Sequence, residues 1–545
     1  MFDFVHREPT NYRLFLSLLP TQRRLGVTQF VRPYSARTIF DVAASKGYPS
    51  TSFWWPGTFP ARPESPVRTF PGLGTPDLMG RMGIGCLYSS DREAPVKMGK
   101  TPVRLLVEEG PGRYRLDVLG PTQKKRSGEN ALTTDLKLVV KDACNAVLKV
   151  GAQIVELTLG HWSPIVELGF RVNRFVSLRA ITRVILTTTA PTAKLYFLPL
   201  QLHPLRPIWP YATPRTFVKH TWQSCGPFLT VGWPQDTTGL EDGCIDDNQF
   251  LALCESIFSA RAKVLLYHLD RFREGVLASV FDTLDRVQHM FWRDRPDVVE
   301  AWCQKLDSLV GRVLQTFPAT GDGDRRLVIL SDHGFDRWDY VVHLNRWLID
   351  RGYLTSSAAG PGDLKQVDWR KTQAYAVGLN SLYLNLEGRE GQGVVRSDTR
   401  RDLAERIRGE LLRWIGPDGQ PVAQNVWLNE QVFVGALAKY GPDLVVGYSP
   451  GYRASPETGL GAWKLKAVER NQSHWGADHC FNPAAVPGVL FVNRDLADLP
   501  RPSYRDVPML TVGEEPDNSA SAPPPSVAEE DEAVLEERLR SLGYL

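Results

Sequence analysis

The stretch LVILSDHGF (327–335) ends an apolar run in an acid and an imidazole, Asp332 and His333. The run predicts a buried strand, and ligands of an open α/β sheet bind beyond the carboxyl ends of its strands. The pair is therefore placed for chemistry at the rim of a sheet. The alternative is a capping turn that contains a histidine. In a chain with ten histidines, about one Asp–His dipeptide arises by chance, so this pair alone does not decide between the two.

Two further places in the sequence combine the same residue types. Asp285 and His289 stand four residues apart after a strand-like run, which puts both side chains on one face if the segment is helical. His479 stands in a Gly- and Pro-rich loop just before the apolar run GVLFV. The structural alternatives are an ordinary amphipathic helix with Asp285 near its start and a loop histidine bonded to the backbone.

Taken together, the three places supply three imidazoles and at least two carboxylates near predicted strand ends. This donor set, without thiolate, suits zinc, or manganese or iron. One catalytic ion uses about three protein ligands and keeps a position open, so five ligands fit two ions better. Two neighbouring ions can clamp the attacking and leaving oxygens of an in-line phosphoryl displacement. The sequence therefore predicts a two-metal site for phosphate-ester chemistry.

The elements that must position these residues alternate between helix and strand after residue 215. Residues 296–317 and 398–415 have helical apolar spacing, and 441–448 reads as an apolar strand. This alternation predicts an α/β fold with a mostly parallel sheet sandwiched by helices. Residues 101–200 instead carry short β-prone runs separated by turn residues, which predicts an inserted antiparallel β subdomain.

These patterns divide the chain into four parts. We expect an N-terminal part of the α/β core with site-covering loops (1–100), the inserted β subdomain (101–212), the main metallohydrolase core (213–512), and a Pro/Ser/acidic linker with a short C-terminal helix (513–545).

Composition excludes several classes of partner. The 545 residues carry a net charge of only +3, which argues against a nucleic acid polymer as the partner. No apolar run reaches the ~18 residues of a transmembrane helix, and no signal peptide is evident. The seven cysteines include no CxxC pair, which suits a reducing compartment. We therefore expect a cytoplasmic protein that acts on a small molecule.

Several of these segments resemble the alkaline-phosphatase superfamily. SDHGF, the DxxxH of DRVQHMFW and the later GADH…PGVLF are similar to its metal-binding motifs. The resemblance is to the type I phosphodiesterase/nucleotide pyrophosphatase branch, including the bacterial predicted phosphohydrolase/phosphomutase group. FWWPGTFP, VELTLGHWSPIVELGF and GPDLVVGYSPGYR extend it over most of residues 1–500. It implies an alkaline-phosphatase-like core.

The resemblance also implies roles for single residues. Asp285, His289 and His479 resemble the ligands of one zinc, and Asp332 and His333 resemble two ligands of the other. Members of the family complete the second site with an aspartate at the end of the first core strand. A Thr or Ser nucleophile nearby forms a covalent phospho-enzyme.

Both groups belong to a segment that precedes a motif similar to HGIFDFVHR, and this sequence begins inside that motif, at MFDFVHREP. We therefore expect an N-terminally truncated chain, with the first strand, its aspartate and the nucleophile upstream of Met1. Thr38 and Thr75 are candidates for a substitute nucleophile only because each carries a hydroxyl, since neither stands in a comparable strand-to-helix context.

Three functions are compatible with these features. The first is a two-metal phosphoric-ester hydrolase of the phosphodiesterase or phosphatase type, acting through a phospho-enzyme on a small phosphate ester. The second is a non-catalytic relative that binds a metal or a phosphate-bearing ligand. The third is a phosphomutase or phosphotransferase of the same superfamily, which only substrate profiling separates from a hydrolase.

Overall fold

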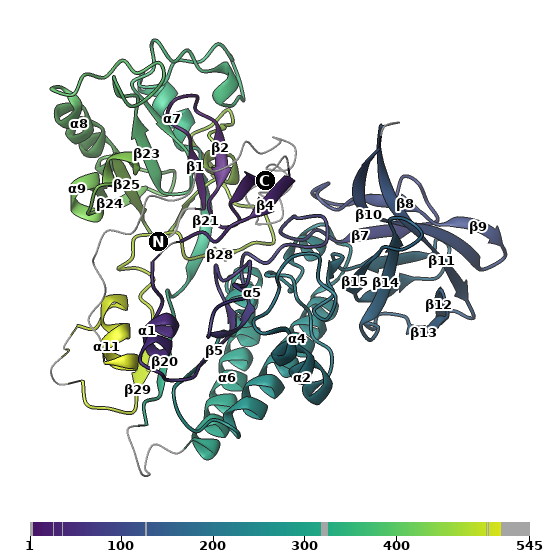
Figure 1. Ribbon diagram of the computed structural model, residues 1–545. Helices are drawn as coiled ribbons and strands as arrows, with labels where there is room; N and C mark the ends of the chain where they lie inside the picture. Colours follow the sequence, from purple (N-terminus) through teal and green to yellow (C-terminus); the bar gives the residue numbers. More distant parts are fainter. Residues whose placement is uncertain are drawn as a thin grey trace.

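The computed structural model describes residues 4–24, 27–34, 36–125, 128–317, 325–496, 499 and 501–513 (Figure 1). The predicted linker and C-terminal helix of 513–545 lie outside the described residues, apart from Gly513. The main helices are α1 (Ile39–Ser45), α2 (Arg215–Cys225), α3 (Thr237–Glu241), α4 (Asp247–Leu269), α5 (Thr283–Phe291), α6 (Pro296–Thr316), α7 (Leu344–Asp350), α8 (Arg400–Leu412) and α11 (Val507–Val512). No helix within these ranges is both long enough and apolar enough to cross a bilayer.

A parallel sheet in the order β19-β5-β6 leads to the candidate site. Its strands are β5 (Ser50–Trp55), β6 (Arg68–Pro71) and β19 (Val276–Ser279). Aromatic side chains cover it: Phe53 of β5, Phe70 of β6 and Phe217 of α2 have ring centroids 4.9–5.8 Å apart. Burial of these rings stabilises the packing of helix on sheet, since each removes a large apolar area from water.

The second half of the core is built from short sheets. Strand β21 (Asp336–Val342) pairs in parallel with β26 (Gly451–Ala454) and antiparallel with β27 (Val468–Arg470) and β28 (Ala477–Asp478). An antiparallel sheet has the order β22-β23-β25-β24 and consists of β22 (Ala374–Ala376), β23 (Ser381–Leu384), β25 (Leu444–Tyr448) and β24 (Ala423–Leu428). Strand β20 (Val328–Leu330) pairs antiparallel with β29 (Leu490–Val492).

The inserted β subdomain forms a lobe of its own beside the helices (Figure 1). A five-stranded antiparallel sheet in the order β13-β12-β11-β10-β9 spans Val107–Gly110, Arg113–Lys125, Gly128–Val140, Asn145–Val150 and Gln153–Thr158. Smaller sheets contain β14 (Val166–Arg171), β15 (Ser177–Thr182), β16 (Val184–Thr188), β17 (Lys194–Phe197) and β18 (Gln201–Leu202), together with β7 (Cys86–Ser89) and β8 (Val103–Leu105). The predicted α/β fold with an antiparallel insertion is confirmed, and the domain limits stay a prediction.

An N-terminal hairpin packs against the second half of the core. Strands β1 (Val5–Arg7) and β2 (Leu14–Leu16) lie against the β22–β25 sheet, where Arg7 Nη2 is 2.7 Å from Glu390 Oε1 with both side chains buried. The Arg7 guanidinium also lies 3.9 Å from the centroid of the Tyr383 ring. These contacts compensate for the cost of burying both charges.

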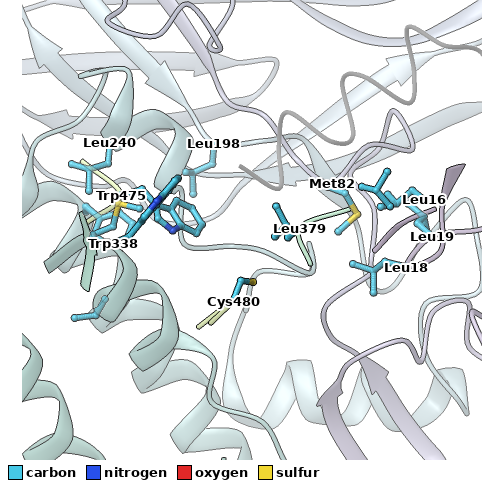
Figure 2. Packing of buried hydrophobic residues seen from close by; sticks show 14 of the residues in the cluster. Leu16, Leu18, Leu19, Met82, Leu198, Leu240, Trp338, Leu379, Trp475 and Cys480 are labelled. Atoms are coloured by element: carbon cyan, nitrogen blue, oxygen red, sulfur yellow. The ribbon is translucent and has the colours of Figure 1, made fainter. Parts of the chain in front are cut away.

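One continuous apolar core runs through the molecule. Figure 2 shows part of it, with Leu16, Leu18 and Leu19 near Met82, and Trp338 and Trp475 together some distance away. Trp475 belongs to the loop that carries His479, so this loop is anchored in the core.

Strand β20 is less buried than the sequence predicts. The apolar run that ends at Leu330 predicts a strand buried on both faces, but Val328 and Ile329 are half-buried and 42% of Leu330 is exposed. The strand is half-buried because it lies at a sheet edge: among the described residues, β20 has β29 on one side and no strand on the other. Strand β19, at the edge of its sheet, is likewise half-buried throughout.

Candidate metal centre

Helix α5 carries the first two candidate ligands, Asp285 and His289, directly after β19. Its start is fixed by Asp282, whose Oδ1 accepts hydrogen bonds from Gln235 Nε2 (2.9 Å) and Arg261 Nη1 (2.6 Å). The segment is helical, and the four-residue spacing places Asp285 Oδ2 3.6 Å from His289 Nε2 on one face of α5.

The orientation of His289 is set by the chain segment that contains His479. The ring is buried, and its Nδ1 lies 2.9 Å from the carbonyl oxygen of Ala477. Because a carbonyl only accepts, Nδ1 carries the proton, and Nε2 is left with its lone pair toward Asp285. Burial lowers the pKa of His289 to about 3, so the ring is neutral near pH 7. Neutral imidazole with one nitrogen tied to a carbonyl is the form in which histidine binds metals.

Two more imidazoles reach the same carboxylate. The rings of His333 and His479 are stacked with centroids 3.6 Å apart. Their Nε2 atoms lie 3.9 and 4.0 Å from Asp285 Oδ1. Burial lowers the pKa of His479 as well. Asp285 therefore lies among three imidazoles that come from three separate parts of the chain.

The fifth predicted ligand, Asp332, lies at the rim of this cluster. Its side chain is 86% exposed, and its Oδ1 is 3.5 Å from Nε2 of the neighbouring His333. The structure thus brings Asp285, His289, His333 and His479 together and leaves Asp332 at the open side. Donor atoms of Asp285, His289 and His479 all lie within 4.8 Å of one another.

This donor set fits a divalent metal ion. One carboxylate and two neutral imidazoles are the ligands of many catalytic zinc sites, which keep a further position open. The tautomer of His289 is already the one that metal binding needs. Asp332 and His333 offer only two donors for a second ion, so the three-ligand group is the better-formed half of the centre.

Three charged residues of the site were not expected from the sequence. Arg286 is buried, forms an ion pair with Asp285 and lies with its guanidinium 3.2 Å from the centroid of the Trp233 ring. Asp478 is buried beside His479 and pairs with Arg453, with 3.0 Å between Oδ2 and Nε. The sequence held a signal for Asp478, since ADH at 477–479 is a second Asp–His dipeptide.

The two hydroxyls considered as substitute nucleophiles have structural roles. Thr38 caps α1 in a capping box with Asp41, and the buried Thr75 donates its hydroxyl to the carbonyl of Gly72 at 2.7 Å. Neither hydroxyl bond involves a candidate metal ligand.

Residues 207–474 match the family model described as type I phosphodiesterase / nucleotide pyrophosphatase. This range contains Asp285, His289, Asp332 and His333, and His479 lies just beyond it. A search of curated proteins found no match.

Proposed function

The chain belongs, over residues 207–474, to the type I phosphodiesterase / nucleotide pyrophosphatase family of the alkaline phosphatase superfamily, and on this premise we propose that it is a metal-dependent phosphoric-ester hydrolase. The observation that carries the proposal is the position of Asp285, whose carboxylate lies within 4.0 Å of Nε2 of His289, His333 and His479. A carboxylate beside the neutral imidazoles of His289 and His479 is a metal-ligand set rather than an acid–base pair.

In this proposal Asp285, His289 and His479 hold one divalent ion, and Asp332 and His333 contribute to a second. Imidazole ligands favour zinc, with manganese and iron as alternatives. When bound, such ions stabilise the negative charge that develops on a transferred phosphoryl group. The carbonyl of Ala477 holds His289 in its metal-binding tautomer.

We propose further that one more strand completes the second half of the centre. The half-buried apolar strands β19 and β20 support this, because each has a strand on one side only among the described residues. Such an edge is stabilised when a further strand pairs with it. In the family resemblance, that strand brings an aspartate and the Thr or Ser nucleophile that forms the phospho-enzyme. Coding DNA upstream of Met1 that lacks an apolar strand ending in Asp, followed by Thr or Ser, would contradict this part.

The proposed substrate is a small phosphate ester in the cytoplasm. A nucleic acid polymer is not proposed, because a net charge of +3 gives little attraction for a polyanion.

The test is hydrolysis of 4-nitrophenyl phosphate and bis(4-nitrophenyl) phosphate, with added Zn²⁺ or Mn²⁺, by purified 1–545 and by the same chain extended through the in-frame coding sequence upstream of Met1. The proposal predicts that the extended protein releases nitrophenol, that 1–545 releases far less, and that a chelator or Asp285→Ala abolishes the release. Turnover that survives both treatments would refute it. His474→Asn is the matched control, because His474 is near in sequence and its Nε2 is instead 3.6 Å from Asp247 Oδ1.

A non-catalytic, metal-binding relative is the second candidate function. It is favoured by one observation: of the five predicted ligands, only three form a tight group, and Asp332 is largely exposed. This candidate predicts one tightly bound metal ion per chain without turnover of either ester. Measurable, Asp285-dependent turnover would exclude it.

A further inference from the structure

Asp478 is a buried carboxylate next to a candidate metal ligand, and N–H groups of the protein surround both of its oxygens. Its Oδ2 accepts a hydrogen bond from Trp475 Nε1 at 3.0 Å and forms an ion pair with Arg453, whose Nε is also 3.0 Å away. Its Oδ1 accepts from the backbone N–H groups of His479 (2.8 Å) and Cys480 (3.0 Å). Three hydrogen bonds and an ion pair thus engage most of its lone pairs, which favours a supporting role over metal ligation.

The partner of Asp478 in the ion pair lies on another strand. Arg453 lies on β26, its guanidinium is 4.4 Å from the centroid of the Trp338 ring, and its Nη1 donates to the carbonyl of Ala454 at 3.1 Å. Both side chains are buried and their charged atoms lie 3.0 Å apart, so each charge compensates for the burial of the other. The pair is therefore charged and fixed in the core.

The two residues of β28 hold both histidines of the three-ligand group. Ala477 binds His289 through its carbonyl, and Asp478 binds His479 through that residue's own N–H. Asp478 Oδ2 also lies 3.9 Å from Nδ1 of His289. Pairing of β28 with β21, in which Asp478 lies opposite Asp336, keeps this strand in place.

From these contacts we propose that Asp478, held by Arg453, is a positioning residue that fixes His479 and His289 for metal binding without itself becoming a ligand. The inference rests on the metal centre of the proposed function. Groups that support metal ligands in this way change metal affinity by about 10- to 100-fold when they are removed. It also gives a role to Arg453 of the GPDLVVGYSPGYR segment.

The test is the affinity of full-length 1–545 for Co²⁺ and Zn²⁺, measured by competition with a chromophoric chelator. Asp478→Asn keeps the shape of the side chain but replaces one acceptor oxygen by a donor group facing Arg453 and Trp475. We expect it to bind Co²⁺ roughly 10- to 100-fold more weakly with the same visible absorption bands, since the ligands are unchanged. Asp285→Asn, which removes a ligand, should lose more affinity and change the bands.

Glu390→Gln is the matched control for a general loss of stability. Glu390 is also a buried carboxylate with several donors, namely Arg7 Nη2, Arg389 Nε and the N–H of Leu386. None of its contacts is a candidate ligand, so Glu390→Gln should lower the unfolding midpoint and leave metal affinity unchanged. If Asp478→Asn does not fold, Arg453→Lys answers the same question, because lysine keeps the charge but loses the fixed geometry of the guanidinium.

Three results would overturn the inference. They are a folded Asp478→Asn protein with wild-type Co²⁺ affinity, an equal loss of affinity in Glu390→Gln, and altered cobalt bands in Asp478→Asn, which would make Asp478 a ligand. Wild-type Co²⁺ affinity in a folded Arg453→Lys protein would likewise overturn the inference. Failure of the wild-type protein to bind Co²⁺ or Zn²⁺ would instead refute the metal centre itself, and the inference with it.

Discussion

Replacement of Arg286 by methionine should change the stability of the metal-free protein and its affinity for metal in opposite directions. Arg286 is buried and forms an ion pair with Asp285, the carboxylate shared by the three imidazoles. A guanidinium and a divalent ion compete for this carboxylate. We therefore expect Arg286→Met to weaken the metal-free fold and to strengthen metal binding.

The magnitudes follow from the contacts of Arg286. Removal of one member of a buried pair costs about 3–5 kcal/mol, and we expect the lower end, roughly 3 kcal/mol, since Asp285 is partly exposed. Methionine keeps an apolar contact with Trp233. At an effective dielectric constant of about 20, a unit charge and a divalent ion separated by a few ångströms would repel each other by several kcal/mol. Part of this is screened by Asp285, so we expect at least about a tenfold gain in affinity.

The assay is urea unfolding of chelator-treated protein with and without Zn²⁺. A tenfold tighter site adds about 1.4 kcal/mol to the stabilisation by metal at saturating concentration. Arg261→Met is the matched control: Arg261 is buried and pairs with Asp282, 2.6 Å away, which is not a candidate ligand. The control should lose stability without gaining metal stabilisation. Metal stabilisation in Arg286→Met that is equal to or below the wild-type value would refute the reasoning.

Two other predictions concern the elements behind the site. Burial lowers the pKa of His268 to about 4, so this ring stays neutral in the fold and takes up a proton in the unfolded chain below about pH 6.5. His268 has no effect on stability above that pH and lowers the free energy of unfolding, by at most ~3 kcal/mol, as pH falls from 6.5 to 4. The urea midpoints at pH 7 and pH 4.5 should therefore differ less in His268→Gln than in the wild-type protein, and an equal difference would contradict this prediction. Gly275→Ala should prevent stable folding, because Gly275 has φ +88° and an added Cβ would lie 1.8 Å from the carbonyl oxygen of Pro49. The matched control Gly47→Ala has a similar φ of +85° but open space around it, so it should cost only about 1–2 kcal/mol. Similar soluble yields and melting temperatures for the two variants would contradict this prediction.

The helices of the site could be predicted from local spacing. The DxxxH spacing predicted that Asp285 and His289 share a face if the segment is helical, and α5 is the helix that meets this condition. The apolar spacing of 296–317 predicted α6 to within a residue, since that helix covers Pro296–Thr316. The helix predicted at 398–415 begins later and ends earlier, at Arg400 and Leu412, because periodic spacing does not mark where the last turns fray.

Properties that depend on distant partners could not be predicted in the same way. An apolar run such as that ending at Leu330 predicts a strand, but its burial depends on whether both lateral neighbours are present. Asp478 was missed because its partner Arg453 is remote in sequence and lies on another strand. The position of His333 and His479 near predicted strand ends favoured a shared site with Asp285, but their convergence on that carboxylate depends on tertiary packing.

The metal-binding role of the three-ligand group can be tested directly by equilibrium dialysis against Zn²⁺, followed by elemental analysis. The account predicts that the wild-type protein and His474→Asn retain at least one zinc ion per chain, and that Asp285→Asn, His289→Asn and His479→Asn each lose it while remaining folded. Zinc retained undiminished by folded Asp285→Asn would contradict the account, because that carboxylate lies among all three imidazoles.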